Sequence, residues 1–400
     1  MEQKIYNEYV EILKEELLPA MGCTEPIAVA YAAAVAVQAL GEKPESVEVN
    51  VSANIIKNVK SVVVPCTGGL RGIGAAVCAG IVAGCPEKEL EILEEITGEQ
   101  KVEMKKMLDT MPMTIRESDK EYIFDIQIKA CAGGHSGYVE IAGFHTNVIC
   151  VKKDDEIIRE KAYEEQGSSC ATDRSLLTVE KIIEFADCVD VADVEEVLQR
   201  QIDYNWAIAE EGMTGNWGAA IGKTLMEAYG NSVHNRAKAM AAAGSDARMN
   251  GCELPVVINS GSGNQGMTTS LPVIVYAKEL NVSKEMMLRA LVVSNLITIH
   301  MKTGIGRLSA YCGAISAGCG AGAGICYLYG GRAYEISHVI VNAVAINSGV
   351  VCDGAKASCA AKIASAVEAG LLGLQMQKNG KQFYGGDGLV EKGVENTIRN

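Results

Sequence analysis

Cysteine is the residue type most able to do chemistry in this chain, with fourteen in 400 residues. No two of them form a Cys-x-x-Cys pair, so the close thiolates of zinc ribbons, thioredoxin-like sites and ferredoxin-type motifs are missing. The N-terminus has no secretory signal, and we therefore expect a reduced, cytoplasmic setting for these thiols. Their remaining roles are packing, catalysis, or a metal site assembled from distant segments.

Two groups of cysteines repeat every seven residues in Ala- and Gly-rich sequence. Cys312, Cys319 and Cys326 form one group, and Cys352 and Cys359 form the other. Read as helices, both groups place their thiols on one face, about 10.5 Å apart along the axis. At most one thiol from each group could then bind a compact cluster, and the alternative for each cysteine is to pack as a small apolar residue.

Cys23 stands just before a predicted helix start, because Pro26 follows at a position suited to a first helical turn. A helix N-terminus stabilises a thiolate, which makes Cys23 a better ligand candidate than a mid-helix cysteine. A site of three thiolates would leave one iron of a cubane cluster without a protein ligand. Such an iron is a Lewis acid that can polarise a substrate heteroatom.

Two of the five histidines are candidates for a general base. His135 lies in a Gly-rich loop at 131–137, and His145 ends a strand-like run; each could instead be structural. The loops at 65–69, 131–137 and 259–266 combine glycines with short polar side chains that can hold a carboxylate. None has the spacing of a phosphate-binding or dinucleotide-binding motif.

The strands and helices that would position these residues are predicted from the sequence pattern, and together they indicate an α+β fold. Alternating patterns at 46–56, 121–129 and 138–152 indicate strands with helices between them, and the sequence from about 206 onward is almost wholly helical. We therefore expect an N-terminal helical segment (1–44) that packs on the C-terminal domain, an α/β domain with a small sheet (45–200) and an Ala/Gly-rich all-helical domain (201–400).

Composition limits the partners. Lys and Arg number 36 against 50 Asp and Glu, and the net charge of −14 disfavours nucleic acid. No apolar run approaches the roughly 20 residues that span a bilayer, so no membrane partner is expected. The expected partner is a small molecule, with a homodimer left open.

Six segments together resemble a known family. They are GCTEP at 22–26, NVKSVVVPCTGG at 58–69, GGHSG at 133–137, SGSGNQG at 260–266, GIGRLSAYCGAISAG at 304–318 and GVVCDGAKASCAAKI at 349–363. In this order they resemble the iron-sulfur L-cysteine desulfidases, relatives of the α-chain domain of the iron-sulfur L-serine dehydratases.

The resemblance covers nearly the whole chain. It implies a [4Fe-4S] cluster held by Cys23, Cys312 and Cys352, the first of them carried by the 1–44 segment. Cys319, Cys326 and Cys359 remain as packing residues, and the role of Cys66, where some relatives carry Gly, stays open.

The implied reaction converts L-cysteine to pyruvate, hydrogen sulfide and ammonia. It needs a base for the α-proton, a Lewis acid for the departing thiolate and a pocket for the carboxylate. His135 and His145 remain alternatives for the base, with His135 preferred for its glycine-flanked loop. The alternative activity is L-serine dehydration by the same cluster. The expected carboxylate and amine binders are Ser260, Ser262, Asn264 and Gln265, followed by Thr67, Asn58 and Arg307.

Overall fold

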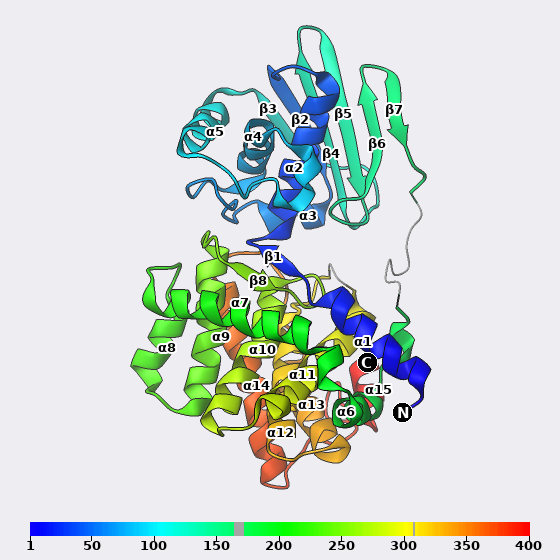
Figure 1. Cartoon of the computed structure of the whole chain (residues 1–400), viewed down its shortest axis with the longest axis vertical. Coiled ribbons are helices and arrows are strands. Elements are labelled where there is room, and N and C mark those ends of the chain that lie inside the picture. The colour runs from blue at the N-terminus through cyan, green and yellow to red at the C-terminus, as the bar shows by residue number, and fades with distance from the viewer. Residues whose placement is uncertain (164–171, 307–308) are drawn as a thin grey trace.

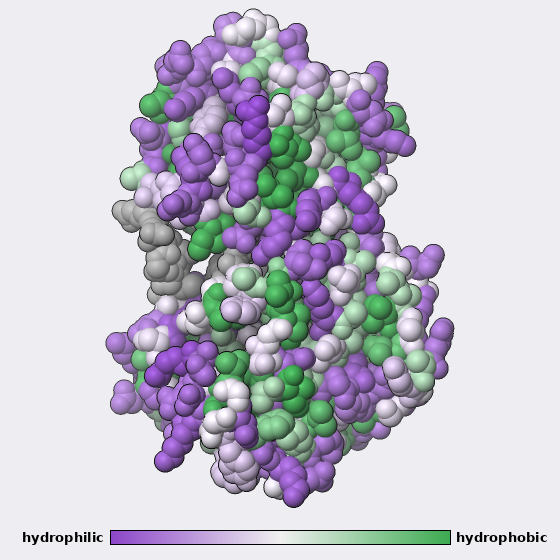
Figure 2. All heavy atoms as spheres, turned by 180° about the vertical axis from the view of Figure 1, so that it is seen from behind, coloured by the Kyte–Doolittle hydropathy of each residue, from purple (hydrophilic) through white to green (hydrophobic). Residues whose placement is uncertain are grey.

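The computed structural model describes residues 1–163, 172–306 and 309–400. It confirms the α+β fold and shows two parts that meet at a narrow junction (Figure 1). We call residues 22–163 the sheet part and residues 1–21 together with the described residues from 172 onward the helical part. Seen from behind, polar residues are spread over both parts, and the outline narrows where they meet (Figure 2).

Six strands of the described residues form one sheet, in the order β3-β2-β4-β5-β6-β7. Neighbouring strands are antiparallel except β2 and β3, which are parallel. The run at 138–152, expected as one strand, contains the end of β5 and most of β6, because the chain turns at Gly143 with a positive φ of 83°. The strands are β2 (Ser46–Val51), β3 (Met113–Glu117), β4 (Asp125–Ala132), β5 (His135–Ala142), β6 (Val148–Lys153) and β7 (Glu156–Glu160).

Helix α2 is the central helix of the sheet part and is buried almost all round, as its Ala-rich sequence predicts. It packs on β4, β5 and α4. The approach to α4 is so close that a Cβ at Gly80 would lie 1.9 Å from the Ala30 carbonyl oxygen. This packing fixes the start of α2 at the junction. The helices here are α2 (Thr24–Leu40), α3 (Ala53–Val59), α4 (Gly72–Ala83) and α5 (Gly98–Thr110), with a 3-10 segment at Pro86–Glu91.

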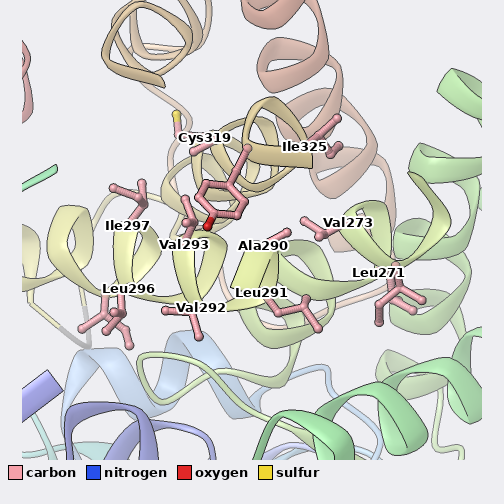
Figure 3. Packing of buried hydrophobic residues seen from close by; sticks show 14 of the residues in the cluster. Leu271, Val273, Ala290, Leu291, Val292, Val293, Leu296, Ile297, Cys319 and Ile325 are labelled. Atoms are coloured by element: carbon pink, nitrogen blue, oxygen red, sulfur yellow. The ribbon is translucent and has the colours of Figure 1, made fainter. Parts of the chain in front are cut away.

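The helical part is built around α10, α11, α12 and α14. Leu271, Val292, Leu296 and Ile325 belong to its buried core (Figure 3). A Cβ at Gly318 would lie 2.2 Å from the Ala366 carbonyl oxygen, so α12 and α14 pack backbone to backbone.

The elements of this part are α1 (Gln3–Glu16), β1 (Pro19–Met21), α6 (Val179–Cys188), α7 (Glu195–Thr214), α8 (Ile221–Tyr229), α9 (Val233–Met249), β8 (Pro255–Val257), α10 (Gly263–Glu279), α11 (Lys284–Ile305), α12 (Ala314–Leu328), α13 (Ala333–Ile346), α14 (Cys359–Lys378) and α15 (Val394–Arg399). Short 3-10 segments lie at Arg174–Leu176 and Val191–Asp193.

The packing does not follow the expected domain boundaries. In the segment 1–44, α1 and β1 pack in the helical part, where β1 pairs with β8, whereas α2 belongs to the sheet core. Helix α6 also joins the helical core, and residue 200 lies inside α7. Periodicity shows that a helix has an apolar face but not which neighbour covers it.

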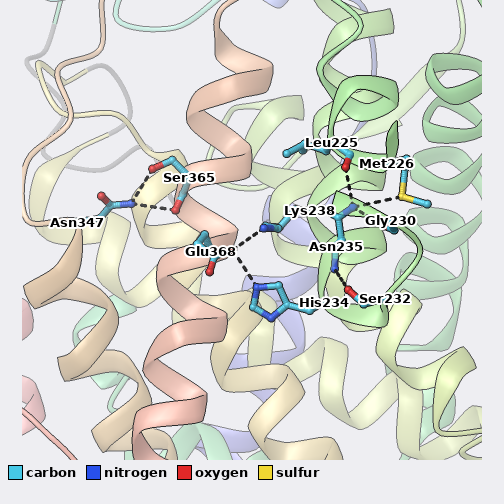
Figure 4. Close-up of polar contacts among 10 residues, drawn as sticks. All are labelled: Leu225, Met226, Gly230, Ser232, His234, Asn235, Lys238, Asn347, Ser365 and Glu368. Atoms are coloured by element: carbon cyan, nitrogen blue, oxygen red, sulfur yellow. Dashed lines mark hydrogen bonds and ion pairs between the residues drawn. The ribbon is translucent and has the colours of Figure 1, made fainter. Parts of the chain in front are cut away.

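Ion pairs link neighbouring helices of the helical part. Glu368 on α14 accepts hydrogen bonds from His234 Nε2 at 2.9 Å and from Lys238 Nζ at 2.6 Å, both on α9 (Figure 4). The bond from His234 and the neighbouring Lys238 lower the pKa of Glu368 to about 2, against the effect of burial. His300 pairs likewise with Glu395 at 2.8 Å. Across the described ranges, no helix is both long and apolar enough to cross a membrane.

Candidate functional site

A cavity of about 820 Å³ lies at the junction and is lined by both parts. The sheet part contributes Cys23, Asn58 and His145, and the helical part contributes Cys312 and Cys352. Thus the three thiols named as cluster ligands, which lie 329 residues apart at the extremes (352 minus 23), line one space together with one of the two candidate bases.

Cys23 is the N-cap residue of α2 and is only 4% exposed. Its Sγ donates a hydrogen bond to Glu25 Oε2 at 3.1 Å. Burial, with the nearby Glu25 carboxylate, raises the pKa of the Cys23 thiol well above its ordinary value. These two effects outweigh the thiolate stabilisation that the sequence led us to expect from the helix N-terminus.

Cys312 and Cys352 are brought together by backbone pairing. Tyr311 and Val351 form an isolated antiparallel bridge, flanked by hydrogen bonds from Cys312 N to Val350 O and from Cys352 N to Ala310 O, each 2.8 Å. Side chains alternate along such a pairing, so both cysteines lie on the face opposite to Tyr311 and Val351. Tyr311 and Val351 are 59% and 67% exposed; Cys312 and Cys352 line the cavity, and Tyr311 also borders it.

The prediction of two helical faces from the seven-residue repeat is therefore wrong. Cys312 lies two residues before α12, and Cys352 lies in a loop before α14, which begins at Cys359. Only Cys319 and Cys326 share a helix, and both are buried in the helical core. Cys359, expected only to pack, also lines the cavity.

Glu25 is one of the cavity groups that the sequence did not single out, as are Lys302 and Lys57. Its carboxylate accepts hydrogen bonds from Cys23, from Thr24 Oγ1 at 3.3 Å and from Asn58 Nδ2 at 3.1 Å. Burial alone would raise the pKa of Glu25, but the charge that His145 carries when protonated, together with the hydrogen bond from Cys23, holds that pKa below its ordinary value. The available signal was its place in the first turn of the helix that Cys23 caps.

The two candidate histidines lie at opposite ends of α2. His145 lines the cavity and packs edge-on against Phe124, with ring centroids 4.9 Å apart. His135 is exposed, bonds Asp154 at 3.0 Å and begins β5, which packs on the Leu40 end of α2. The 17 residues of α2 span about 25 Å, which separates His135 from Cys23.

The start of α10 forms another wall of the cavity. Its N-cap, Ser262, makes no side-chain capping bond, and Asn264 and Gln265 also line the space. Gln265 Oε1 is buried and has no hydrogen-bond partner in the described ranges. Arg248 joins this wall to the sheet part, donating to Asn264 Oδ1 at 3.3 Å and to Gly22 O at 2.6 Å.

Two further candidates, Ser260 and Thr67, do not line the cavity. Ser260 Oγ donates to Asn259 Oδ1 at 2.8 Å, and Thr67 Oγ1 donates to Val64 O at 2.7 Å, so both hydroxyls support their own loops. Arg307 lies outside the described residues. Cys66 is buried beside Thr67 in the left-handed conformation (φ 60°), and burial raises the pKa of its thiol to about 11.

Two lysines complete the lining near the paired thiols. Lys302 is 4% exposed and donates to Ser309 Oγ at 3.4 Å, while Lys57 donates to Ser309 O at 3.3 Å. Burial lowers the pKa of Lys302 to about 8, and the neighbouring Cys352 and Cys312 act in the opposite direction.

The three thiols that line the cavity are side chains of the type that binds an iron-sulfur cluster. Among the residues described, no group of three or more His, Cys, Asp or Glu is arranged to hold one metal ion. A cluster differs from a single ion because its thiolate ligands bind different irons, so the ligands surround a volume and do not meet at one point. Three thiols on separate segments around one cavity meet this requirement.

Comparison with known proteins places the chain in a family. Residues 87–400 match the serine dehydratase alpha chain family, and the chain belongs to it. Over its whole length it is similar to proteins called UPF0597. It is 59% identical to that of Desulfitobacterium hafniense (100% of this chain, 93% of the relative), 50% to that of Lachnoclostridium phytofermentans (98% and 94%) and 44% to that of Treponema denticola (100% and 94%).

Proposed function

We propose that this protein is an L-cysteine desulfidase that uses a [4Fe-4S] cluster held by Cys23, Cys312 and Cys352. The observation that carries the proposal is that these three thiols line one cavity with His145. Membership of the serine dehydratase alpha chain family supports a lyase reaction at this cavity. When bound, the cluster supplies an iron without a protein ligand, a Lewis acid for the β-substituent of the substrate.

His145 is the proposed base because its imidazole reaches the cavity and that of His135 lies at the far end of α2. The imidazole takes the α-proton, the C–H electron pair forms the Cα–Cβ double bond, and the Cβ–S bond breaks with its electrons on sulfur. The nearby Glu25 carboxylate stabilises the imidazolium so formed. The aminoacrylate tautomerises and hydrolyses to pyruvate and ammonia.

Ser262, Asn264 and Gln265 are the proposed contacts to the polar groups of the amino acid, because all three line the same cavity at the start of α10. Asn58 has a different role in this proposal: its amide holds the Glu25 carboxylate in place.

Sulfur is the favoured leaving atom. A thiol has a pKa near 8.5 and water about 15.7, so thiolate departs with less assistance than hydroxide. The description of the matched family favours a second candidate, L-serine dehydration at the same site.

The decisive experiment supplies each amino acid to anaerobically reconstituted protein and measures pyruvate, sulfide, iron and the absorption spectrum. We expect equal amounts of pyruvate and sulfide from L-cysteine, with L-serine a poor substrate or an inhibitor. Faster pyruvate release from L-serine would make the protein a dehydratase, and protein that takes up no iron would refute both activities.

A further inference from the structure

Lys302 is a charged group of the cavity to which the proposed reaction gives no role. It lies on α11, its side chain is 4% exposed, and its ammonium makes a single long hydrogen bond of 3.4 Å to Ser309 Oγ. In the described part of the chain, no carboxylate lies within ion-pair distance of it. A buried cation is costly unless an opposite charge accompanies it, which points to an anion that enters the cavity.

Lys57 approaches the same point from the other part of the molecule. Its ammonium, carried by α3, donates to the backbone oxygen of Ser309 at 3.3 Å, and it too has no carboxylate within ion-pair distance in the ranges described. Two cations from different parts therefore meet at one residue of the cavity wall. They lie beside Cys312 and Cys352, whose charges act on Lys302.

A third lysine near these thiols differs from the other two because a carboxylate of the protein balances its charge. Lys362 on α14 forms an ion pair with Asp353 and donates to Val351 O at 3.1 Å. The charge of Lys362 is thus already compensated by the protein, whereas those of Lys57 and Lys302 are available to a ligand.

We propose that Lys302 and Lys57 form the subsite that binds the α-carboxylate of the substrate. This inference rests on the proposed function and deepens it, because it defines the substrate class as α-amino acids and excludes the amines that lack the carboxyl group. A carboxylate held here places the β-substituent near Cys312 and Cys352. The unpartnered Gln265 Oε1, an acceptor only, then suits the substrate ammonium group.

The test uses two probes that each lack one group of L-cysteine. 3-Mercaptopropionate keeps the thiol and the carboxylate, and cysteamine keeps the thiol and the amine. Their binding to iron-loaded protein is measured by anaerobic calorimetry for the wild type and for Lys302→Met. We expect the substitution to weaken 3-mercaptopropionate about 10- to 100-fold, as for a charged hydrogen bond, and to leave cysteamine and the iron content unchanged.

Lys362→Met is the matched control and should bind both probes as the wild type does. Lys302→Arg, which keeps the charge, should retain the preference for 3-mercaptopropionate. If Lys302→Met does not fold, Lys57→Met, a change at a half-buried side chain, gives the same comparison with the same expectation.

Equal weakening of both probes, or loss of iron with unchanged probe preference, would overturn the inference and assign the lysines to the fold or the cluster. Failure of the proposed function has a different signature. The protein would then bind no iron or release no pyruvate, while apoprotein would still discriminate between the probes through Lys302.

Discussion

The two walls of the cavity differ in what they contribute. The sheet part presents Glu25 and His145, an acid–base pair, with one thiol, that of Cys23. The helical part presents the paired thiols of Cys312 and Cys352 with the cation of Lys302. The sheet part also carries Lys57, so the proposed carboxylate subsite takes one cation from each part, and the proposed site is complete only while the two parts stay in contact.

The walls also differ in how they are positioned. On the sheet side the groups sit at the ends of regular elements, the start of α2 and the turn between β5 and β6. On the helical side the two thiols sit in loops before α12 and α14 that one antiparallel bridge aligns, whereas Lys302 sits on α11. Polar contacts that join the two sides include those of Arg248 with Gly22 O and of Lys57 with Ser309 O. A cluster bound by thiols from both sides would add a further link.

The largest effect should come from removing a thiol on either wall. Cys23→Ala on the sheet side and Cys312→Ala or Cys352→Ala on the helical side should each abolish pyruvate and sulfide release. The reason is that two thiolates cannot replace three in holding the cluster. Iron content and absorption after anaerobic reconstitution measure the cluster directly. Full iron retention in Cys23→Ala would remove the sheet part from the proposed cluster site.

The second-largest effect should distinguish the two histidines, which lie near opposite ends of α2. His145→Ala should lower turnover by about 10²- to 10⁴-fold, the contribution of a general base, and retain the cluster. His135→Ala should leave turnover unchanged, because that side chain is exposed beyond the far end of α2. The check is kcat in both variants at equal iron content, and unchanged turnover in His145→Ala would transfer the base role to another group.

A third effect compares one buried aspartate in each part. Burial raises the pKa of Asp246 in the helical part from 3.8 to about 6; Gly222 N donates to its Oδ2, and its Oδ1 has no partner among the described residues. Burial also raises the pKa of Asp125 in the sheet part, but Ser118 and Gln127 donate hydrogen bonds to its carboxylate. The aspartate with fewer side-chain donors should make stability more dependent on pH.

The sign follows from proton binding. A carboxyl group with a raised folded-state pKa binds its proton more tightly when folded, so its contribution to the free energy of unfolding is greatest below about pH 4 and is lost as pH rises through 6. For Asp246 the loss is about 3 kcal/mol at most. Denaturant unfolding at pH 4 and 6.5 should show that Asp246→Asn removes this dependence and that Asp125→Asn removes less of it. The reverse order would show that the polar contacts of Asp125 do not compensate its burial.

The sequence singled out the three thiols, but it did not predict how they are arranged. The family resemblance named Cys23, Cys312 and Cys352 as a set, and all three line one cavity; that they hold a cluster stays a prediction. The pairing of Cys312 with Cys352 through Tyr311 and Val351 was not predictable, because an isolated bridge leaves no periodic pattern.

The limits of the sequence were similar for the other groups. In the sequence, Lys302 looks like any other lysine of a helix. Only the structure shows that it is buried. His135 and His145 are ten residues apart in sequence, and only the course of β5 along α2 shows that they lie near opposite ends of that helix.

The smallest effect should come from cysteines that lie away from the cavity. Replacing them tests whether the cavity thiols alone are needed for iron binding and turnover. Cys78 on α4 and Cys319 on α12 are buried in the cores of the sheet part and the helical part, respectively. Each acts as a small apolar residue, so Cys78→Ala and Cys319→Ala should each lower the free energy of unfolding by about 1 kcal/mol and leave iron content and turnover unchanged. Denaturant unfolding of the apoproteins measures the first quantity, and an iron assay measures the second. If Cys319→Ala lost iron as Cys312→Ala should, both thiols would be needed to hold the cluster, and the assignment of a single ligand to that segment would be wrong.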